Sequence, residues 1–259
     1  MMKKIFVTCF IFQMFILFAY SQGEIDTQKK VFYRNEKSVG LLLNSNGWGM
    51  NYRFGKRINA FKKYLYEVDF VGFKHPKEIK LSNAYNPTGK NYVFGKKNCC
   101  LDLRLGYGLQ NEIFSKADKG GIAVRYFYTG GLSVAMLKPI YYEVFYANSY
   151  SVSDEKFSSS ITSPSDILGR SSFFKGASET QFIPGIFMKF GFNFEYSQED
   201  RILHALEAGC IAESFVKELP IMATAKNNQF YFMLFVSYRF GKVVDPTERK
   251  KIFTKDNEW

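Results

Sequence analysis

Two histidines are the residues of this sequence best suited to acid–base chemistry. His204 lies near Ser197 and Glu207, which makes a conceivable set for a lipid-modifying hydrolase. Such an enzyme needs a nucleophile, a histidine and an orienting acid within hydrogen-bonding reach. No nucleophile motif surrounds Ser197, and His75, which precedes Pro76, is expected to cap or pack a loop. The sequence therefore predicts no catalytic residue, and a hydrolase is the least favoured function.

The cysteines do not indicate a metal site. Cys99, Cys100 and Cys210 follow the segment that we expect to be removed on export. Neighbouring residues of a strand point to opposite faces, so at most one of Cys99 and Cys100 could pair with Cys210. Free, packed thiols are favoured over a disulfide, although the sequence leaves their state open. Because no CxxC or histidine spacing accompanies them, we expect no metal and no cofactor.

A basic and aromatic segment, Lys74 to Lys97, is the main candidate for binding. Its six lysines are accompanied by Glu78 alone among the acidic residues, and aromatic residues lie between them. The segment is either a docking surface for an acidic partner or a solvated basic loop beside anionic head groups, and it is longer than a plain turn requires. The candidate partner-binding residues are Lys74, His75, Lys77, Lys80, Tyr85, Tyr92, Lys96 and Lys97.

The N-terminus is typical of a secretory signal peptide. Met1 to Lys4 is a short basic start, Ile5 to Tyr20 is largely apolar, and Ala19-Tyr20-Ser21 provides small residues before Gln22. The apolar run is shorter than the roughly 20 residues that a spanning helix needs. Removal of Lys3 and Lys4 leaves +9 of the formal net charge of +11. Nucleic acid can bind interleaved lysines and aromatic residues, but an exported protein rarely meets it, so we expect none.

Alternating apolar residues predict strands throughout the rest of the chain. Leu101 to Gln110 and Ile186 to Tyr196 place their apolar residues on one face, which is the period of a half-buried strand. Phe230 to Phe240 alternates less cleanly, because its second face carries Tyr231, Met233 and Phe235 beside Ser237 and Arg239. Further predicted strands are Tyr64 to Phe73, Ile122 to Tyr128, Leu132 to Val144 and Leu203 to Phe215.

The polar face of these strands decides between a soluble and a membrane protein. It carries charges of both signs that can pair across a narrow lumen: Glu67, Asp69, Asp102, Arg104, Arg125, Glu143, Lys189, Glu195, Glu207 and Arg239. The apolar face is rich in aromatic residues, which suits acyl chains and interfacial girdles. We therefore predict an all-β fold, a small antiparallel up-and-down transmembrane β-barrel, over an exported soluble barrel or sandwich. Its predicted lumen charge network is Asp102, Arg104, Arg125, Lys189, Glu195 and Arg239.

The strand count depends on two segments. The apolar phase breaks at Asn44-Ser45-Asn46-Gly47, either at a bulge in one long strand or at a hairpin turn. A bulged strand, together with a turn at Thr129-Gly130-Gly131, makes a total of eight strands, which we prefer; ten remain open. If the last strand ends in the periplasm, 197–201 and the Thr129 turn are inner turns and 111–121, 147–183 and 216–228 are outer loops. The segment 74–98 is then on the inner side, where it is unusually long.

Three short stretches are distinctive: Asn-Gly-Trp-Gly at 46–49, Tyr-Arg-Phe-Gly-Lys-Arg at 52–57 and Lys-His-Pro-Lys-Glu at 74–78. With the strand pattern and a signal peptide that ends Ala-Tyr-Ser-Gln, they resemble a poorly characterised family of outer-membrane β-barrel proteins from Bacteroidota. The resemblance implies an outer-membrane location and a barrel fold, and it brings no catalytic residue. Such small barrels are suspected accessory subunits of larger assembly or secretion complexes.

These observations predict a signal peptide (1–21), an N-terminal periplasmic segment (22–37), an outer-membrane barrel (38–241) and a C-terminal tail (242–259). The expected function is a non-catalytic outer-membrane barrel, in contact with lipid, that serves as a structural or accessory interaction subunit of an envelope complex. A narrow channel or ligand-binding barrel is the alternative. The partner, the oligomeric context and lumen conductance stay open. The Ser-rich stretch Ser149 to Ser178 is expected to be a flexible external loop.

Overall fold

The computed structural model describes residues 35–83, 86, 89–116, 120–146, 150–158, 161, 163–197, 199 and 201–244. The predicted signal peptide, most of the predicted N-terminal segment and the tail from residue 245 lie outside the described residues. So does Tyr85 of the candidate binding segment.

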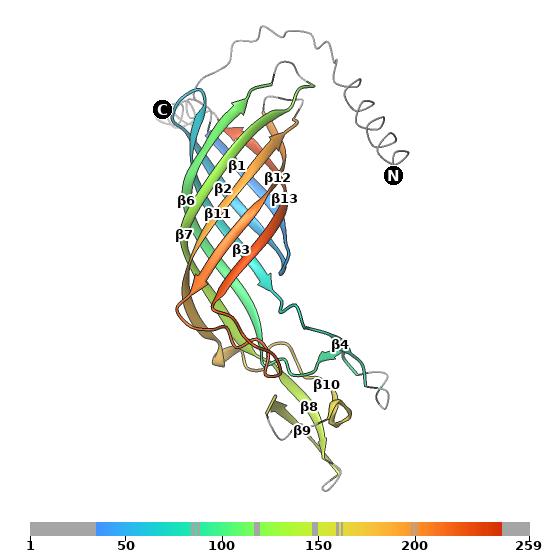
Figure 1. The fold of residues 1–259 in the computed structure, drawn as a ribbon. Helices are drawn as coiled ribbons and strands as arrows, with labels where there is room; N and C mark the ends of the chain where they lie inside the picture. Colours follow the sequence, from blue (N-terminus) through green and yellow to red (C-terminus); the bar gives the residue numbers. More distant parts are fainter. Residues whose placement is uncertain are drawn as a thin grey trace, which may run out of the picture.

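Eight antiparallel strands form a closed barrel (Figure 1). Around the wall the strands follow the order β1-β13-β12-β11-β7-β6-β3-β2. The barrel closes where the first strand pairs with the last, from Asn35 opposite Val244 to Asn44 opposite Phe235. The small antiparallel up-and-down barrel of eight strands predicted from the alternation is thus confirmed as the fold. Its strands are β1 (Asn35–Asn44), β2 (Gly47–Arg57), β3 (Lys62–Phe73), β6 (Asn98–Phe114), β7 (Ala123–Pro139), β11 (Gln181–Glu195), β12 (Ile202–Phe215) and β13 (Phe230–Val244).

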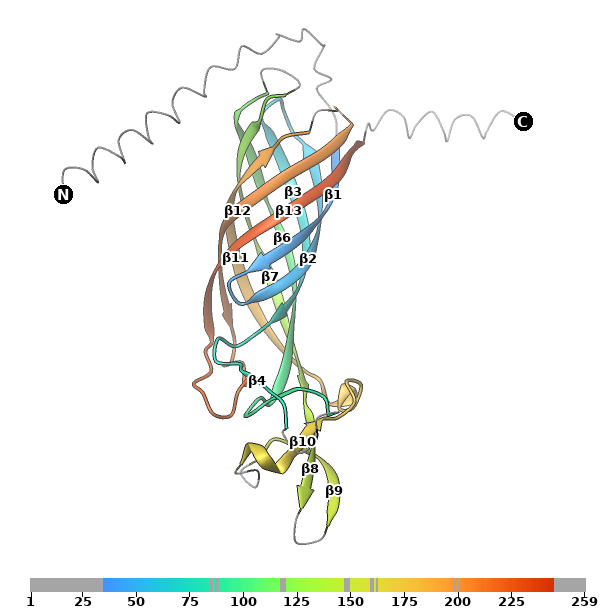
Figure 2. The same cartoon turned by 90° about the vertical axis from the view of Figure 1, so that its right-hand side faces the viewer.

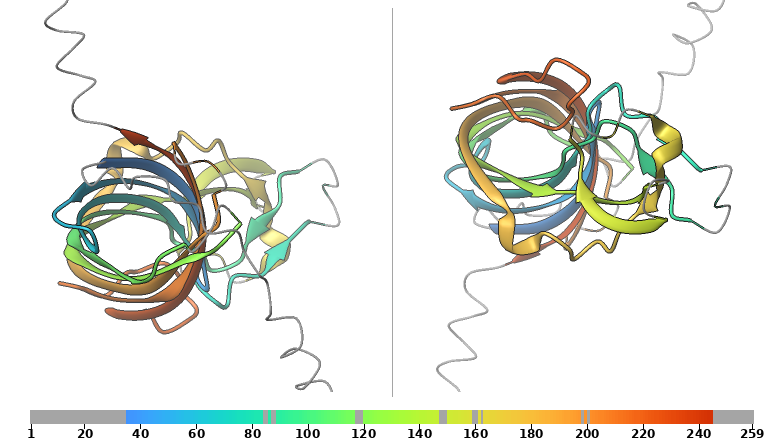
Figure 3. Two further views of the ribbon diagram at one scale, coloured as in Figure 1. Left: turned by 90° about the horizontal axis from the view of Figure 1, so that it is seen from above. Right: turned by 90° about the horizontal axis from the view of Figure 1, so that it is seen from below.

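The remaining elements form a small assembly at one end of the barrel, which we call the head: the described residues of 74–97 and 140–180 (Figure 2). β8 (Tyr141–Tyr146) is the middle strand of a three-stranded sheet, between β10 (Ile167–Arg170) and β9 (Ser151–Lys156). β4 (Lys80–Leu81) pairs with β5 (Tyr92–Val93). The 3-10 turns are η1 (Pro164–Asp166) and η2 (Ala177–Glu179). Viewed along the barrel axis, the head lies to one side of the closed ring (Figure 3).

The predicted count of eight strands is correct, but two local predictions on which it depended are wrong. The phase break near residue 44 is a hairpin and not a bulge, since Asn44 pairs with Gly47. Glycine is required there because a Cβ at Gly47 would lie 1.8 Å from the carbonyl oxygen of Gly72. Conversely, Thr129-Gly130-Gly131 is no turn but the middle of the continuous strand β7. The predicted strand Leu132 to Val144 is also divided, since β7 ends at Pro139 and Glu143 belongs to β8 in the head rather than to the lumen.

Because residues 129–131 are not a turn, the connections that precede them lie at the opposite end of the barrel from the one predicted. We call the end at which β1 begins and β13 ends the terminal end, and the opposite end the head end. Because neighbouring strands are antiparallel, 58–61, the described part of 115–122 and the described part of 196–201 lie at the terminal end. The segment 74–98 lies at the head end with 216–229. Its predicted placement on the same side as the last strand's end is therefore wrong.

The outer wall of the barrel is apolar. Along β13 every second residue from Phe230 to Phe240 is exposed, and Leu234 is 62% exposed. At about 3.4 Å per residue and a tilt of about 40°, this run rises about 26 Å along the axis, close to the roughly 25 Å apolar band of transmembrane barrels. Tyrosines such as Tyr66, Tyr107 and Tyr238 face outward toward the terminal end, as interfacial girdles do. No helix in the described part of the chain is long and apolar enough to cross a bilayer.

Candidate functional site

The centre of the lumen is filled by a network of buried ion pairs. Lys189 Nζ lies 2.8 Å from Glu67 Oε1 and 3.1 Å from Asp69 Oδ2. Glu67 also pairs with Arg53 at 3.0 Å. The five strands β2, β3, β11, β12 and β13 contribute to this network, since Arg53 and Arg239 both pair with Glu207. The charges therefore connect opposite parts of the wall through the interior.

Two smaller ionic clusters lie on either side of this network. In one, the Arg104 guanidinium contacts Asp102 and Glu213, each at 2.7 Å, with all three side chains buried. In the other, near the terminal end, Arg125 pairs with Glu195 and lies 3.2 Å from Glu112. All six residues of the predicted lumen network face inward, but the structure distributes them among three clusters: Lys189 and Arg239, Asp102 and Arg104, and Arg125 and Glu195.

An apolar plug, which the alternation of the strands did not predict, closes the head-end half of the lumen. Phe73 packs edge-on against Tyr231, with ring centroids 4.9 Å apart, and Phe215 packs against the same ring. The segment between β12 and β13 adds Leu219 and Ile221, both fully buried. The weak alternation of β13 was the feature of the sequence that could have indicated this plug. Tyr231, Met233 and Phe235 face the lumen because there it is apolar.

Cations and aromatic rings meet where the charged layer joins the plug. The Arg53 guanidinium lies 4.4 Å from the centroid of the Phe127 ring, and Lys189 Nζ lies 5.0 Å from that of Phe235. Such contacts stabilise cations that have been removed from water. The Lys189 side chain is 0% exposed, so this layer is packed rather than water-filled. An eight-stranded barrel has room for side chains inside and little else.

The residues considered for hydrolysis are not brought together. Glu207 faces the lumen, where it is held by Arg53 and Arg239. The His204 ring lies on the outer face, with Nδ1 3.1 Å from the Tyr238 hydroxyl. Ser197 Oγ accepts a hydrogen bond from the backbone N–H of His204 at 2.8 Å. These contacts orient a turn at the terminal end and do not assemble a nucleophile, base and acid.

A cleft of about 210 Å³ in the head concentrates basic residues. Its walls carry five cationic side chains and one acidic one, Glu78, which pairs with Lys96 at 2.6 Å. The floor belongs to the apolar core of the head, which includes Tyr92, Ile140 and Tyr142. The five cations are Lys74, Lys80, Lys96, Lys138 and Arg170.

Two tyrosine hydroxyls fix the floor of this cleft. The single hydroxyl proton of Tyr142 is shared between the carbonyl oxygens of Val93 and Lys96, which lie 2.8 and 2.7 Å from the hydroxyl oxygen. Burial, with a smaller contribution from the Glu78 carboxylate, raises the pKa of Tyr142 above its ordinary value. Tyr92 donates to the carbonyl oxygen of Pro164 at 2.7 Å, and burial raises its pKa as well. Three distant segments of the chain are thereby joined around the cleft.

The predicted partner-binding residues divide between the cleft and its surroundings. Lys74, Lys80, Tyr92 and Lys96 line it. His75 stabilises the adjoining turn, where its Nδ1 accepts the Lys77 N–H at 3.2 Å. Lys97 lines a separate hollow on the head. Three further residues line the cleft that were not among the predicted ones: Lys138 from the end of β7, and Arg170 and Phe173 from the stretch predicted to be a flexible loop.

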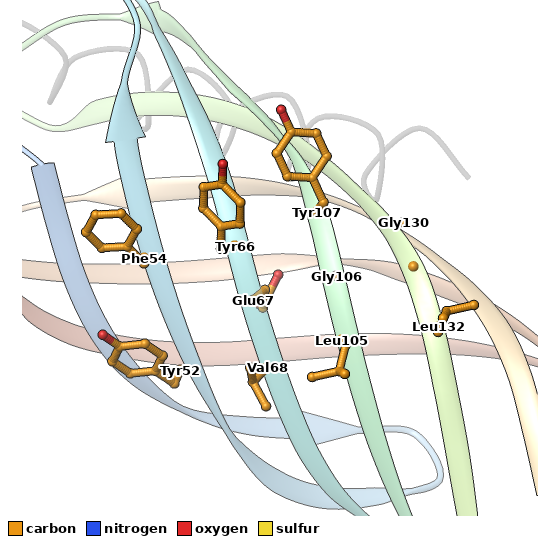
Figure 4. Close-up of a pocket in the computed structure, with 11 residues that line it drawn as sticks. Tyr52, Phe54, Tyr66, Glu67, Val68, Leu105, Gly106, Tyr107, Gly130 and Leu132 are labelled. Atoms are coloured by element: carbon orange, nitrogen blue, oxygen red, sulfur yellow. The ribbon is translucent and has the colours of Figure 1, made fainter.

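A second hollow, of about 420 Å³, lies on the outer wall of the barrel (Figure 4). Tyr66 and Tyr107 border it, with ring centroids 5.3 Å apart, and Leu132 lies along its edge. Gly130, which pairs with Tyr107, faces outward and leaves the space open, because the atom nearest to a Cβ there would be 3.6 Å away. The hollow is mostly apolar and suits a lipid chain rather than a polar ligand.

Comparison with known proteins gives no family and some distant structural similarities. No protein-family model matches the chain, and no curated protein matches it. Among solved structures, Neisserial surface protein A is similar over 82% of this chain and 96% of its own, at 10% identity and a TM-score of 0.37. The N-terminal β-barrel domain of Pseudomonas aeruginosa OprF is similar over 81% of this chain and 98% of its own, at 8% identity and a TM-score of 0.38.

Proposed function

We propose that this protein is a non-catalytic outer-membrane barrel with a sealed lumen, which acts through its head as an interaction subunit of an envelope complex. One observation carries most of the proposal. Charges that would line a water-filled pore instead pair with one another across the interior, as Lys189 does with Glu67 and Asp69. The apolar plug around Tyr231 supports the same conclusion at the head end.

The outer wall supports a membrane location. Large exposed side chains such as Leu234, Met188 and Leu132 follow one another around the barrel. Soluble monomers rarely expose apolar patches larger than a few hundred Å². In hydrocarbon the same surface is stable, because all backbone groups of a closed barrel are paired within the wall.

Conductance in planar bilayers tests the sealed lumen. The full mature chain, refolded in detergent and inserted into a planar bilayer, is expected to give no stable current steps. Stable open steps would favour the narrow-channel alternative and overturn the sealed barrel. Lys189→Ala removes the cation that joins β11 to β3, so an opening of the lumen should be detected most readily in this variant.

Co-purification from detergent-solubilised outer membranes tests the interaction role. We expect a stoichiometric complex that is lost when Lys74, Lys77 and Lys80 at the head end are changed to Glu. The control changes Lys56 and Lys62, which are also exposed but lie at the terminal end. Loss of the complex in both variants, or in neither, would count against the head as the docking surface.

A further inference from the structure

We infer that the basic cleft of the head is a binding site for a phosphorylated sugar, with a dianionic phosphate held by the cations and a single sugar ring held by the aromatic walls. This inference deepens the proposed function by naming the chemistry that the head recognises, and it rests on that function only for the exposure of the head outside the membrane.

The charge balance of the cleft calls for an anion. Lys96 is neutralised by Glu78, but Lys74, Lys80 and Arg170 make no side-chain ion pair with any residue that the structure describes. Lys138 Nζ reaches the carbonyl oxygen of Phe173 and no carboxylate among the described residues. Several cations in one concave site repel one another. A bound dianion relieves this repulsion.

The origin of the cations favours phosphate over a single carboxylate. Lys74 and Lys80 belong to the connection between β3 and β6, Lys138 to the end of β7, and Arg170 to the end of β10. Donors therefore approach from separate segments of the chain. A phosphate group offers three acceptor oxygens and close to two negative charges, so it can satisfy donors from several directions at once.

The uncharged walls of the cleft favour a ring beside the phosphate. Tyr92, Tyr141 and Phe173 line it, and the Phe173 ring is held in place by the Lys138 ammonium, 4.3 Å from its centroid. Ligand sites typically combine such apolar or aromatic walls with a few fixed polar groups. The volume of about 210 Å³ is smaller than the 300–1,000 Å³ of drug-sized sites, so it limits the ligand to about one sugar ring with its phosphate.

The floor of the cleft is held in place by hydrogen bonds, so the site is formed before a ligand binds. The Tyr142 hydroxyl bonds to the carbonyl oxygens of Val93 and Lys96 from beneath, and Tyr92 is anchored to Pro164. The ligand thus meets a surface whose backbone is already held, which reduces the cost of ordering on binding.

Isothermal titration of the full mature chain in detergent micelles tests the inference. Glucose 6-phosphate is expected to bind, inorganic phosphate to bind more weakly, and glucose to show no binding. Lys80→Ala combined with Arg170→Ala should lower the affinity for glucose 6-phosphate about tenfold or more, since each removes a charge-assisted hydrogen bond. The control Lys56→Ala with Lys62→Ala, at the terminal end, should leave it unchanged.

A second arm identifies the source of the phosphorylated sugar. Co-sedimentation with phosphatidylcholine vesicles that contain lipid A, compared with vesicles that contain its dephosphorylated form, reports a lipid-borne ligand. Competition by glucose 6-phosphate would place that ligand in the cleft. Binding of glucose 6-phosphate without selective co-sedimentation identifies a free sugar phosphate, and either source supports the site.

The inference is overturned if no phosphorylated probe binds, if glucose binds equally well, or if the control variant loses as much affinity as the cleft variant. For each variant, a difference in gel migration between unheated and heated samples verifies that the barrel is folded. If no phosphorylated probe binds, but the barrel does not conduct and still co-purifies with its complex, only the sugar-phosphate site is contradicted. Open conductance with intact sugar-phosphate binding contradicts only the sealed lumen.

Discussion

The Lys189 ammonium on β11 lies 2.8 Å from the Glu67 carboxylate on β3, although β7 and β6 separate the two strands in the wall. The ion pair therefore spans the interior of the barrel and not a neighbouring strand pair. Both side chains are fully withdrawn from solvent. Removing one partner of such a pair leaves an uncompensated buried charge, which typically costs 3–5 kcal/mol.

Lys189→Met is accordingly expected to lower the free energy of unfolding by about 3 kcal/mol. The measurement is urea-induced unfolding of the barrel in detergent micelles. Lys62→Met, at an exposed position of β3, is the control and should stay within about 0.5 kcal/mol of the wild type. Adding Asp69→Asn to Lys189→Met should recover part of the loss, since Asp69 is the carboxylate left without its cation while Glu67 keeps Arg53 and Arg239. Equal stability of Lys189→Met and the control would show that the pair does not hold the lumen together.

An arginine on the outer wall should destabilise the barrel according to its depth. Leu234→Arg lies midway along the outward run of β13 and is expected to cost about 2–4 kcal/mol in a bilayer. Phe230→Arg, at the head end of the same face, should cost about 0–1 kcal/mol. Equilibrium folding into phospholipid vesicles gives both values. If the two substitutions cost the same, the wall does not face hydrocarbon over this length.

Two adjacent glycines of β7 should respond very differently to alanine. A Cβ at Gly131 would lie 1.9 Å from the carbonyl oxygen of Leu105, whereas at Gly130 the nearest atom is 3.6 Å away. Gly131→Ala should therefore impair closure of the barrel, seen as loss of heat-modifiable migration on gels. Gly130→Ala should fold normally and fill part of the outer hollow. Normal folding of Gly131→Ala would contradict the continuous strand through residues 129–131.

The head should loosen in acid before the barrel does. Hydrogen bonds from Lys156 and Tyr141 lower the pKa of Glu179, and a hydrogen bond from Lys175 lowers that of Asp154. A carboxyl whose pKa is lower in the folded state contributes stability above its unfolded pKa, and that contribution is lost as the pH falls through the folded value. Both groups are exposed, so the effect is local and modest.

Amide hydrogen exchange measures this effect. Protection in β8 and β9 should fall between pH 5 and pH 3 while protection in β12 and β13 persists, after correction for the intrinsic pH dependence of exchange. In Glu179→Gln the fall in the head should be smaller, because one of the two titrating carboxyls is gone. Unchanged head protection at pH 3 would rule out a role for these pairs in holding the sheet.

The sequence was sufficient for the alternation and the total of eight strands, but the total was right because two errors cancelled. Glycine pairs mark tight turns and also mark strands that approach each other closely, and Gly130-Gly131 is the second case. At Asn46-Gly47 the reverse choice was needed. Local sequence does not distinguish the two, since the distinction depends on what the neighbouring strand places opposite the glycine.

The basic cleft could be predicted only in part for a related reason. The lysines of 74–97 were recognisable as a group, but Arg170 and Lys138 join them only through the pairing of β8 with β10 and the length of β7. Side chains so far apart in the sequence are brought together by topology, and no spacing rule reports that. Likewise, the inward course of Tyr231 and Phe235 becomes interpretable once the plug from the β12–β13 connection is known.

The pairing of β1 with β13 also restricts how the molecule can be made. The seam joins Asn35 to Val244, the two extremes of the described chain, so the cylinder stays open along one side until its final strand has emerged. Contacts between such remote positions form slowly. Until then both seam edges present unsatisfied backbone groups, which other chains can pair with while the cylinder is open.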